Sequence, residues 1–169
     1  GFHDGGYDLL DPGSVASPGL ERLAEDGNAM VLREEVGAGA PSGVDGMIGG
    51  APIAPGDVVT QTFTVDAANR FFSYASMVLP SNDAFVGNAD AMGVEVFGED
   101  GAFTGADFFL TGDMVWDAGT EVNDELPENT AFFGQAAPDT GVPEGGVVSP
   151  HPGFLGSLGN PGTPSILGD

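Results

Sequence analysis

Two apolar stretches of the sequence run into polar loops that carry carboxylates. The first is MVLPSND, which ends on Asp83, and the second is WDAGTE, which contains Asp117 and Glu121. Pro80 lacks a backbone N–H and ends strand pairing before the first loop, and Gly119 permits a tight turn between the two acids of the second. Calcium takes about six to eight oxygen ligands from carboxylates, carbonyls and water. Three carboxylates that converge from two loops would suit this ion. From the spacing alone, however, acids in such loops are more often simply exposed to solvent.

Other residues suggest weaker sites. A second calcium site could form among Asp113, Asp124 and Glu125, but acids at this density are typical of a solvated surface. Trp116 directly precedes Asp117 and could be an exposed binding platform. A single tryptophan after apolar neighbours is more often part of the core, so we predict its burial.

The residue types for acid–base or nucleophilic catalysis are sparse. The two histidines, His3 and His151, could form a metal or acid–base pair, but both lie in Gly/Pro-rich turns, where a structural hydrogen bond is the stronger prediction. There is no cysteine and no Gly-x-Ser-x-Gly motif. Ser73, Ser76 and Ser81 lie on or beside a predicted strand with no histidine nearby in the sequence, which argues against a hydrolytic triad.

The charge of the chain narrows the functions that it can have. Its 169 residues include 26 acids, three arginines and no lysine, for a net charge of −23. Such a surface repels nucleic acid and anionic membranes. It suits high salt or abundant divalent cations, which screen self-repulsion, and so predicts a marine or halophilic source. The sequence has no run of about 18 apolar residues, so no transmembrane helix is predicted. No signal peptide is visible, and the turn-like start at 1–6 suggests that a preceding segment was removed or left out.

The elements that must position these residues are mostly short strands. One helix is predicted over 17–27, with Ser17 as N-cap, Pro18 at the first helical position and Gly27 as the stop. Alternation over 58–65, a turn at 66–69 and an apolar run over 71–79 predict an antiparallel hairpin. Further strands are expected at 30–36, 94–97, 108–110, 114–116 and 147–148, with a turn at 99–101 and loops elsewhere. The fold class is therefore all-β, an antiparallel β-sandwich with one short helix near the N-terminus.

The sequence resembles the spondin N-terminal domain family, whose animal members include F-spondin and mindin. The resemblance rests on FSYASMVLPSNDAFVG and WDAGTE, with support from LAEDG and SPHPGF, and it extends over about residues 2–167. It implies a C2-like antiparallel β-sandwich with one bound calcium ion. It also implies that Asp83, Asp117 and Glu121 are the calcium ligands, with Glu121 standing where the animal members have Asp.

The resemblance implies that residues 1–169 form a single spondin-like domain. The sequence differs from the family pattern in two places. Family members begin with a strand before the segment that matches residues 1–4 and end with another after the segment that matches 164–169. Neither strand is evident in this sequence. Trimming, processing, or strands donated by a neighbouring subunit would each account for the difference.

The function expected from these features is that of a secreted, calcium-binding, non-catalytic interaction or adhesion module. Its partner would be an extracellular protein or a polysaccharide, or another copy of the chain. One alternative is a structural subunit of an extracellular filament or surface layer that assembles by strand exchange. Another is a calcium-dependent hydrolase acting on polysaccharide, in which paired carboxylates would perform the chemistry.

Overall fold

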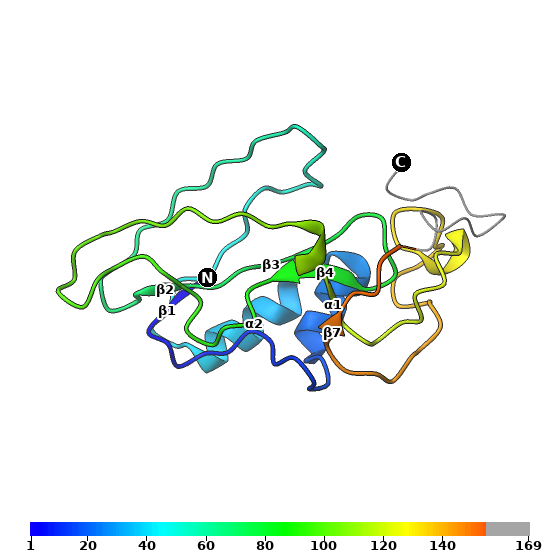
Figure 1. Cartoon of the computed structure of the whole chain (residues 1–169), viewed down its shortest axis with the longest axis horizontal. Helices are drawn as coiled ribbons and strands as arrows, with labels where there is room; N and C mark the ends of the chain where they lie inside the picture. The colour runs from blue at the N-terminus through cyan, green and yellow to red at the C-terminus, as the bar shows by residue number, and fades with distance from the viewer. Residues whose placement is uncertain (155–169) are drawn as a thin grey trace.

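The computed structural model describes residues 1–154, and its strands form two antiparallel sheets (Figure 1). One sheet has the order β1-β2-β5 and the other the order β3-β4-β6-β7. The strands are β1 (Phe2–His3), β2 (Phe71–Phe72), β3 (Ala75–Met77), β4 (Ala84–Gly87), β5 (Val94–Glu95), β6 (Trp116–Asp117) and β7 (Ser149–Pro150). Two 3-10 turns, η1 (Gly112–Met114) and η2 (Pro127–Asn129), flank the bend after β6. Antiparallel sheets were predicted, and every strand pairing in residues 1–154 is antiparallel.

Helix α1 (Pro18–Asp26) confirms the predicted helix and its caps. The Ser17 hydroxyl accepts a hydrogen bond from the Leu20 N–H at 3.1 Å, which satisfies one of the free donors of the first turn. Gly27 ends the helix with a φ of 69°, a left-handed conformation that glycine adopts without strain. Leu20 and Leu23 point into the core from one face of the helix.

Helix α2 (Met30–Gly39) occupies the segment for which a strand was predicted at 30–36, so that prediction is wrong. The Glu35 carboxylate accepts hydrogen bonds from the Ser17 hydroxyl at 2.6 Å and the Gly19 N–H at 2.8 Å, which ties α2 to the start of α1. The helices approach closely at Gly19, where a Cβ would lie 2.4 Å from the Leu32 Cα. Contact with α1 therefore determines the structure of this segment, and residues 1–154 contain two α-helices where one was expected.

The predicted hairpin of 58–65 with 71–79 does not form. Residues 58–62 are exposed, and within the described residues no backbone–backbone hydrogen bond joins 58–65 to another segment. The run 71–79 is divided between β2, which pairs with β1 and β5, and β3, which pairs with β4. The turn at 66–69 is confirmed by the Asn69 N–H bonded to the Asp66 carbonyl at 3.1 Å. Alternation allowed a strand at 58–65, but no neighbouring edge is available to pair with it.

The remaining strand predictions are met in part. Strand β5 lies within the predicted 94–97, and β6 and β7 begin two residues later than 114–116 and 147–148. Residues 108–110 form no strand; Phe108 instead stacks on Tyr74 with ring centroids 4.9 Å apart. The turn at 99–101 is confirmed by the Gly101 N–H bonded to the Gly98 carbonyl at 2.9 Å. The predicted lack of a strand after 164–169 concerns a segment outside the described residues.

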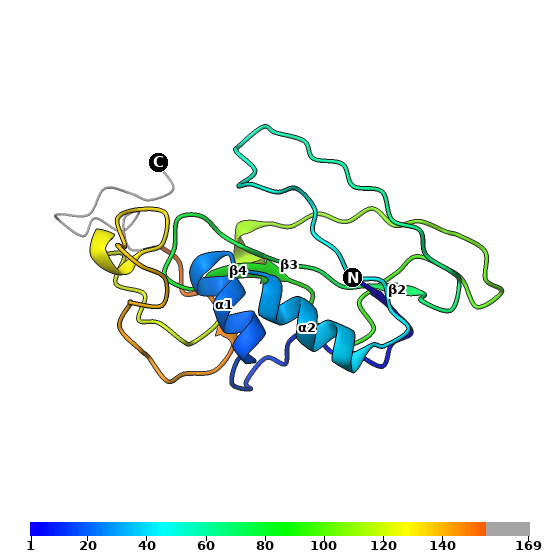
Figure 2. The ribbon, with the colours of Figure 1, turned by 180° about the vertical axis from the view of Figure 1, so that it is seen from behind.

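The core lies between the helices and the β3-β4-β6-β7 sheet. Figure 2 shows α1 and α2 lying over β3 and β4, and α1 contacts both strands. The largest fully buried side chain is Phe85 of β4, which packs with Leu20 and Val148. Trp116 is half-buried against this core and donates its indole N–H to the Gly87 carbonyl at 3.1 Å, in agreement with its predicted packing role. The acids that end β6 and precede β4 are thus held on a packed layer.

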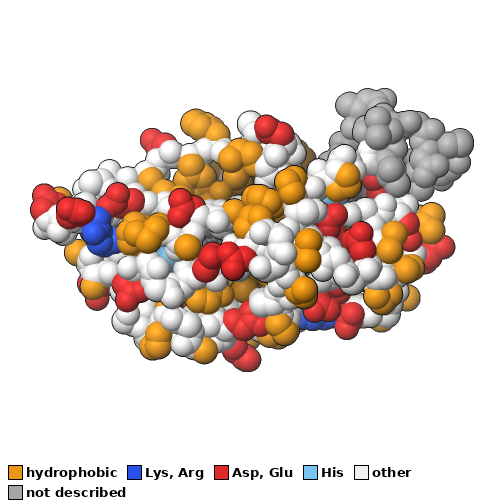
Figure 3. All heavy atoms as spheres, turned by 60° about the horizontal axis from the view of Figure 1, so that its bottom comes forward, with side chains coloured by type: hydrophobic (Ala, Val, Ile, Leu, Met, Phe, Trp, Pro, Cys, Tyr) orange, Lys and Arg blue, Asp and Glu red, His pale blue; other side chains and the backbone are white. Residues whose placement is uncertain are grey.

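Carboxylates are spread over the surface, and positive side chains are few, as Figure 3 shows for one face. None of the helices in residues 1–154 has the length and apolar character that crossing a membrane requires.

Replacing the cap of α1 should measurably weaken the helix layer. In Ser17→Ala, both the bond to the Leu20 N–H and the bond to Glu35 are lost. We expect the free energy of unfolding to fall by about 1–2 kcal/mol in chemical denaturation. Ser14→Ala, at an exposed serine three residues earlier, should change it by less than about 0.5 kcal/mol. Equal effects of the two substitutions would contradict the capping role.

Candidate metal site

Asp83 is fully buried in the loop that leads into β4, and its carboxylate reaches the bend after β6. Its Oδ2 accepts hydrogen bonds from the Thr120 N–H at 2.8 Å, the Thr120 hydroxyl at 3.2 Å and the Glu121 N–H at 3.1 Å. Its Oδ1 is buried and has no hydrogen-bond partner among the described residues. The two loops singled out in the sequence therefore meet at Asp83, with one carboxylate oxygen left over.

Asp117 ends β6 beside Asp83, because Ala84 of β4 pairs with Asp117 in the sheet register. Its Oδ1 accepts a hydrogen bond from the Gly119 N–H at 2.6 Å, and its Oδ2 accepts one from the Asn123 side-chain amide at 2.5 Å. Gly119 has a φ of 69°, and a Cβ there would lie 2.5 Å from the Val147 nitrogen. The glycine of the WDAGTE motif is therefore required both by backbone conformation and by close packing.

Glu121 has its backbone beside Asp83, but its carboxylate is held in a different direction. Its Oε1 accepts a hydrogen bond from the Gly141 N–H at 2.8 Å, and its Oε2 is buried without a partner in the described structure. A Cβ at Gly141 would lie 2.1 Å from this Oε1, so the contact depends on a glycine. Of the three predicted ligands, Asp83 and Asp117 share one cluster of oxygens, whereas Glu121 touches that cluster through its backbone.

Glu144 joins Asp83 and Asp117, although no motif in the sequence pointed to it. One oxygen from each of the three carboxylates lies within 4.8 Å of the others. Residues 142–146 run along the bend after β6 through three backbone bonds: Val122 N–H to Val142, Glu144 N–H to Thr120, and Gly146 N–H to Gly119, at 2.8, 2.9 and 2.7 Å. The motif PEGG signals a turn, but only this long-range pairing shows which bend its acid faces.

Burial raises the pKa of three carboxyl groups near the bend after β6, those of Asp83, Glu121 and Glu144. Burial raises the pKa of Asp83 to about 6, although hydrogen bonds from Glu121 and Thr120 oppose the shift. It raises the pKa of Glu121 to about 8, with repulsion from Glu25 adding to the effect. The pKa of Glu144 is also raised, first by burial and then by the nearby charge of Asp117. A bound cation would lower these pKa values again, because a nearby positive charge favours the charged forms of the carboxyl groups.

The stability of the calcium-free protein should fall as pH rises. A carboxyl whose pKa is higher in the folded than in the unfolded chain contributes stability that is complete below the unfolded pKa and lost through the folded pKa. For Asp83 and Glu121 this window extends from about pH 4 to about pH 8. We expect the melting temperature in EGTA to decrease across it, with a shallower decrease in Glu121→Gln. Identical pH profiles for the two proteins would show that Glu121 does not titrate in this way.

The weaker calcium site predicted at Asp113, Asp124 and Glu125 does not assemble in residues 1–154 as a three-acid cluster. Asp113 lies in η1. Asp124 Oδ2 accepts a hydrogen bond from the Asn129 side chain at 2.6 Å, and the Glu125 N–H bonds to Asn82 at 3.2 Å. Asp124 and Glu125 therefore shape the loop around η2.

His3 makes structural hydrogen bonds, as predicted, but one of them reaches a serine that was expected to have no histidine near it. His3 Nε2 lies 2.8 Å from the Ser73 hydroxyl, and both residues are buried. The Gly5 N–H donates to His3 Nδ1 at 3.1 Å, so the ring proton of the neutral imidazole is on Nε2. In this tautomer His3 donates to Ser73 and cannot accept its proton, so the pair lacks the base of a nucleophilic serine site.

His151 also accepts a backbone hydrogen bond, from the Gly153 N–H to its Nδ1 at 3.1 Å. Its ring lies against Phe154, with centroids 4.6 Å apart. Burial lowers the pKa of His151, and the charges of Asp117 and Glu125 oppose that shift. The two histidines therefore occupy separate structural positions, each fixed by a backbone N–H two residues later.

A cavity of about 600 Å³ lies away from these acids, between α2, β2, β3 and the loop 45–53. Its lining is mostly apolar, and its charged members in the described structure are Arg33 and Asp45. These two are paired, with Arg33 Nε 2.6 Å from Asp45 Oδ2. Hydrolysis of a glycoside generally uses two carboxyl groups facing each other across the substrate. The cavity does not offer that arrangement.

The comparisons with known proteins identify the family. Residues 1–125 match the family model described as Spondin_N. The matched segment includes Asp83, Asp117 and Glu121 and ends before Glu144. No curated protein and no solved structure matches the chain. Since the match extends over 125 of 169 residues, the chain belongs to the Spondin_N family.

Proposed function

We propose that this chain is a secreted, non-catalytic interaction module in which Asp83, Asp117 and Glu121 hold one calcium ion. The observation that carries the proposal is the buried Asp83 carboxylate, which is bonded to the bend after β6 through Oδ2 and has an unpaired Oδ1. Glu144 extends the set of acids around it. A rotation of the Glu121 side chain from Gly141 towards Asp83 would complete the ligand set.

The positive charge that this cluster needs is not supplied by the chain itself. The chain has three arginines and no lysine, and each arginine is paired with an acid elsewhere. Arg22 pairs with Asp26 and Asp139, Arg33 with Asp45, and Arg70 with Glu95. Buried carboxylates without a paired charge are strongly unfavourable. An ion from solution is therefore the natural partner of Asp83 and Asp117.

The donor atoms favour calcium over zinc or copper. The set consists of carboxylate oxygens, and the chain has no cysteine. Oxygen-only sites of irregular geometry suit calcium, whereas zinc and copper prefer nitrogen and sulfur. Extracellular modules bind calcium with dissociation constants of about 0.1–1 mM, which extracellular calcium is able to fill. Calcium binding thus fits the secreted location that we propose.

The ion would fasten three segments at one end of the fold. These are the loop before β4, the bend after β6, and residues 142–146 that run along the bend. Such loops at the end of a β-sandwich are a common place for partner contacts. We propose a C2-like sandwich with its interaction surface there. The two antiparallel sheets and the family membership support this arrangement.

Calorimetric titration with calcium tests the proposal. We expect calcium binding at this site to be weakened at least tenfold (about 1.4 kcal/mol) in Asp83→Asn and in Asp117→Asn. Glu128→Gln, at an exposed acid of η2, serves as the matched control and should bind like the wild type. Unchanged affinity in both site variants would contradict the proposed ligands. Calcium-dependent retention on immobilised matrix protein or polysaccharide, lost in Asp83→Asn, tests the interaction role.

A further inference from the structure

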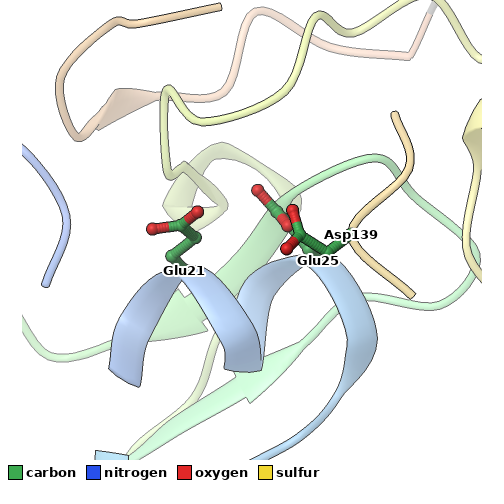
Figure 4. Close-up of side chains that lie close together, drawn as sticks. All are labelled: Glu21, Glu25 and Asp139. Atoms are coloured by element: carbon green, nitrogen blue, oxygen red, sulfur yellow. The ribbon is translucent and has the colours of Figure 1, made fainter. Parts of the chain in front are cut away.

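A second cluster of carboxylates lies beside α1 and does not include Asp83 or Asp117. It consists of Glu21 and Glu25, one turn apart on the helix, and Asp139 from the long loop before β7. One oxygen of each lies within 4.8 Å of the others. Figure 4 shows the Glu25 and Asp139 carboxylates side by side, with Glu21 on the same helix.

Glu25 distinguishes this cluster from ordinary surface acids. Its side chain is 2% exposed, and its Oε2 is buried with no hydrogen-bond partner in residues 1–154. A buried carboxylate oxygen without a donor is costly, and native structures usually satisfy it with protein, water or an ion. Burial raises the pKa of Glu25 to about 7, with a hydrogen bond from Thr120 partly opposing the shift.

The surroundings add negative charge to this position. Like charges at i and i+4 of a helix repel each other, and the C-terminal half of a helix disfavours carboxylates. Glu121, whose pKa is raised first by burial and then by Glu25, faces the same region with an unpaired Oε2. No motif in the sequence marks this meeting, because Asp139 is 114 residues from Glu25 along the chain.

Arg22, which lies near the cluster, pairs with Asp26 and Asp139 and not with the two glutamates. Arg22 NH2 lies 2.5 Å from Asp26 Oδ2, and Arg22 NH1 lies 3.4 Å from Asp139 Oδ2. The Asp139 N–H also donates to Asp26 Oδ1 at 3.2 Å. These contacts hold Asp139 beside α1, but no ion pair within residues 1–154 neutralises Glu21 or Glu25.

We propose that Glu21, Glu25 and Asp139 form a second calcium site. Three carboxylates with water in the remaining positions make a hard, oxygen-only ligand set. The ion would fasten the loop around Asp139 to α1, as the first site would fasten the same loop through Glu144. Asp139 lies beyond the residues that match the family model, so the family match does not cover this site.

Native mass spectrometry of the full chain with added calcium counts the two sites separately. We expect two specifically bound ions in the wild type and one in each of Glu25→Gln, Asp139→Asn and Asp83→Asn. The double variant Asp83→Asn, Asp139→Asn should bind none. Glu128→Gln, an exposed acid outside both clusters, is the control and should bind two. Asp139 is largely exposed, so its variant reports on the site even if Glu25→Gln disturbs folding.

The possible outcomes separate this inference from the proposed function. Two ions in both Glu25→Gln and Asp139→Asn, or a single ion in the wild type that only Asp83→Asn removes, would overturn the second site. A single ion that Glu25→Gln and Asp139→Asn remove, but Asp83→Asn does not, would support this site and contradict the first. A matching loss of stoichiometry with an unchanged near-UV spectrum confirms that binding, not folding, has been altered.

Discussion

Chelation of calcium with EGTA should lower the melting temperature of this protein by roughly 5–10 °C relative to saturating calcium. An ion that binds only the folded state stabilises it by about 2.7 kcal/mol when its free concentration is a hundred times the dissociation constant. The expected effect is large because the Asp83 and Glu121 carboxyl groups are buried and each has an unpaired oxygen in the absence of the ion. Differential scanning calorimetry measures the shift.

Two controls separate binding from screening. The net charge of −23 means that any salt will stabilise the fold to some degree by weakening self-repulsion. Sodium chloride at matched ionic strength should therefore reproduce only a small part of the shift. Asp83→Asn should lose the part of the calcium-specific shift that binding at Asp83 supplies. If sodium chloride stabilises the wild type as much as calcium does, the ion has no specific structural role.

Asp83→Ala should be the most destabilising single substitution at this end of the fold. It removes the acceptor of the Thr120 and Glu121 backbone N–H groups and leaves both donors buried. We expect the free energy of unfolding in EGTA to fall by about 2–4 kcal/mol in urea denaturation. The same loss should appear as increased amide exchange along residues 119–122.

Asp83→Asn distinguishes the two roles of this residue. Its amide oxygen retains an acceptor for the backbone donors but cannot supply a charge to an ion. We expect it to lie within about 1 kcal/mol of the wild type in EGTA and to gain less stability from calcium than the wild type does. Asp113→Ala, at an exposed acid of η1, should be neutral in both conditions. An Asp83→Ala protein as stable as Asp113→Ala would contradict the organising role of Asp83.

Local signals in the sequence predicted the parts of the fold that local chemistry decides. Ser17 and Gly27 fix the ends of α1 by bonds within a few residues, and both were readable in advance. The segment 30–39 carries no comparable cap, and its helix depends on Glu35 meeting the start of α1. The strand expected at 58–65 failed for the same reason, because a strand needs a partner edge that alternation cannot guarantee.

The candidate site shows the same division between local and long-range information. Asp83, Asp117 and Glu121 came from two motifs, and hydrogen bonds of the Asp83 carboxylate join these two motifs in the structure. Glu144 could not be found in this way, because it reaches the site through backbone bonds from a Gly/Pro-rich loop. The sequence placed Glu25 in a helix but could not predict its burial, because its contact with Thr120 arises from tertiary packing.

Anomalous diffraction from crystals grown in saturating calcium tests the central claim most directly. The account predicts an anomalous peak with oxygens of Asp83, Asp117 and Glu121 at about 2.3–2.6 Å, and with the Glu121 side chain turned away from Gly141. A pocket at Asp83 that stays free of anomalous density, while its Oδ1 bonds to a water or a protein donor, would contradict it.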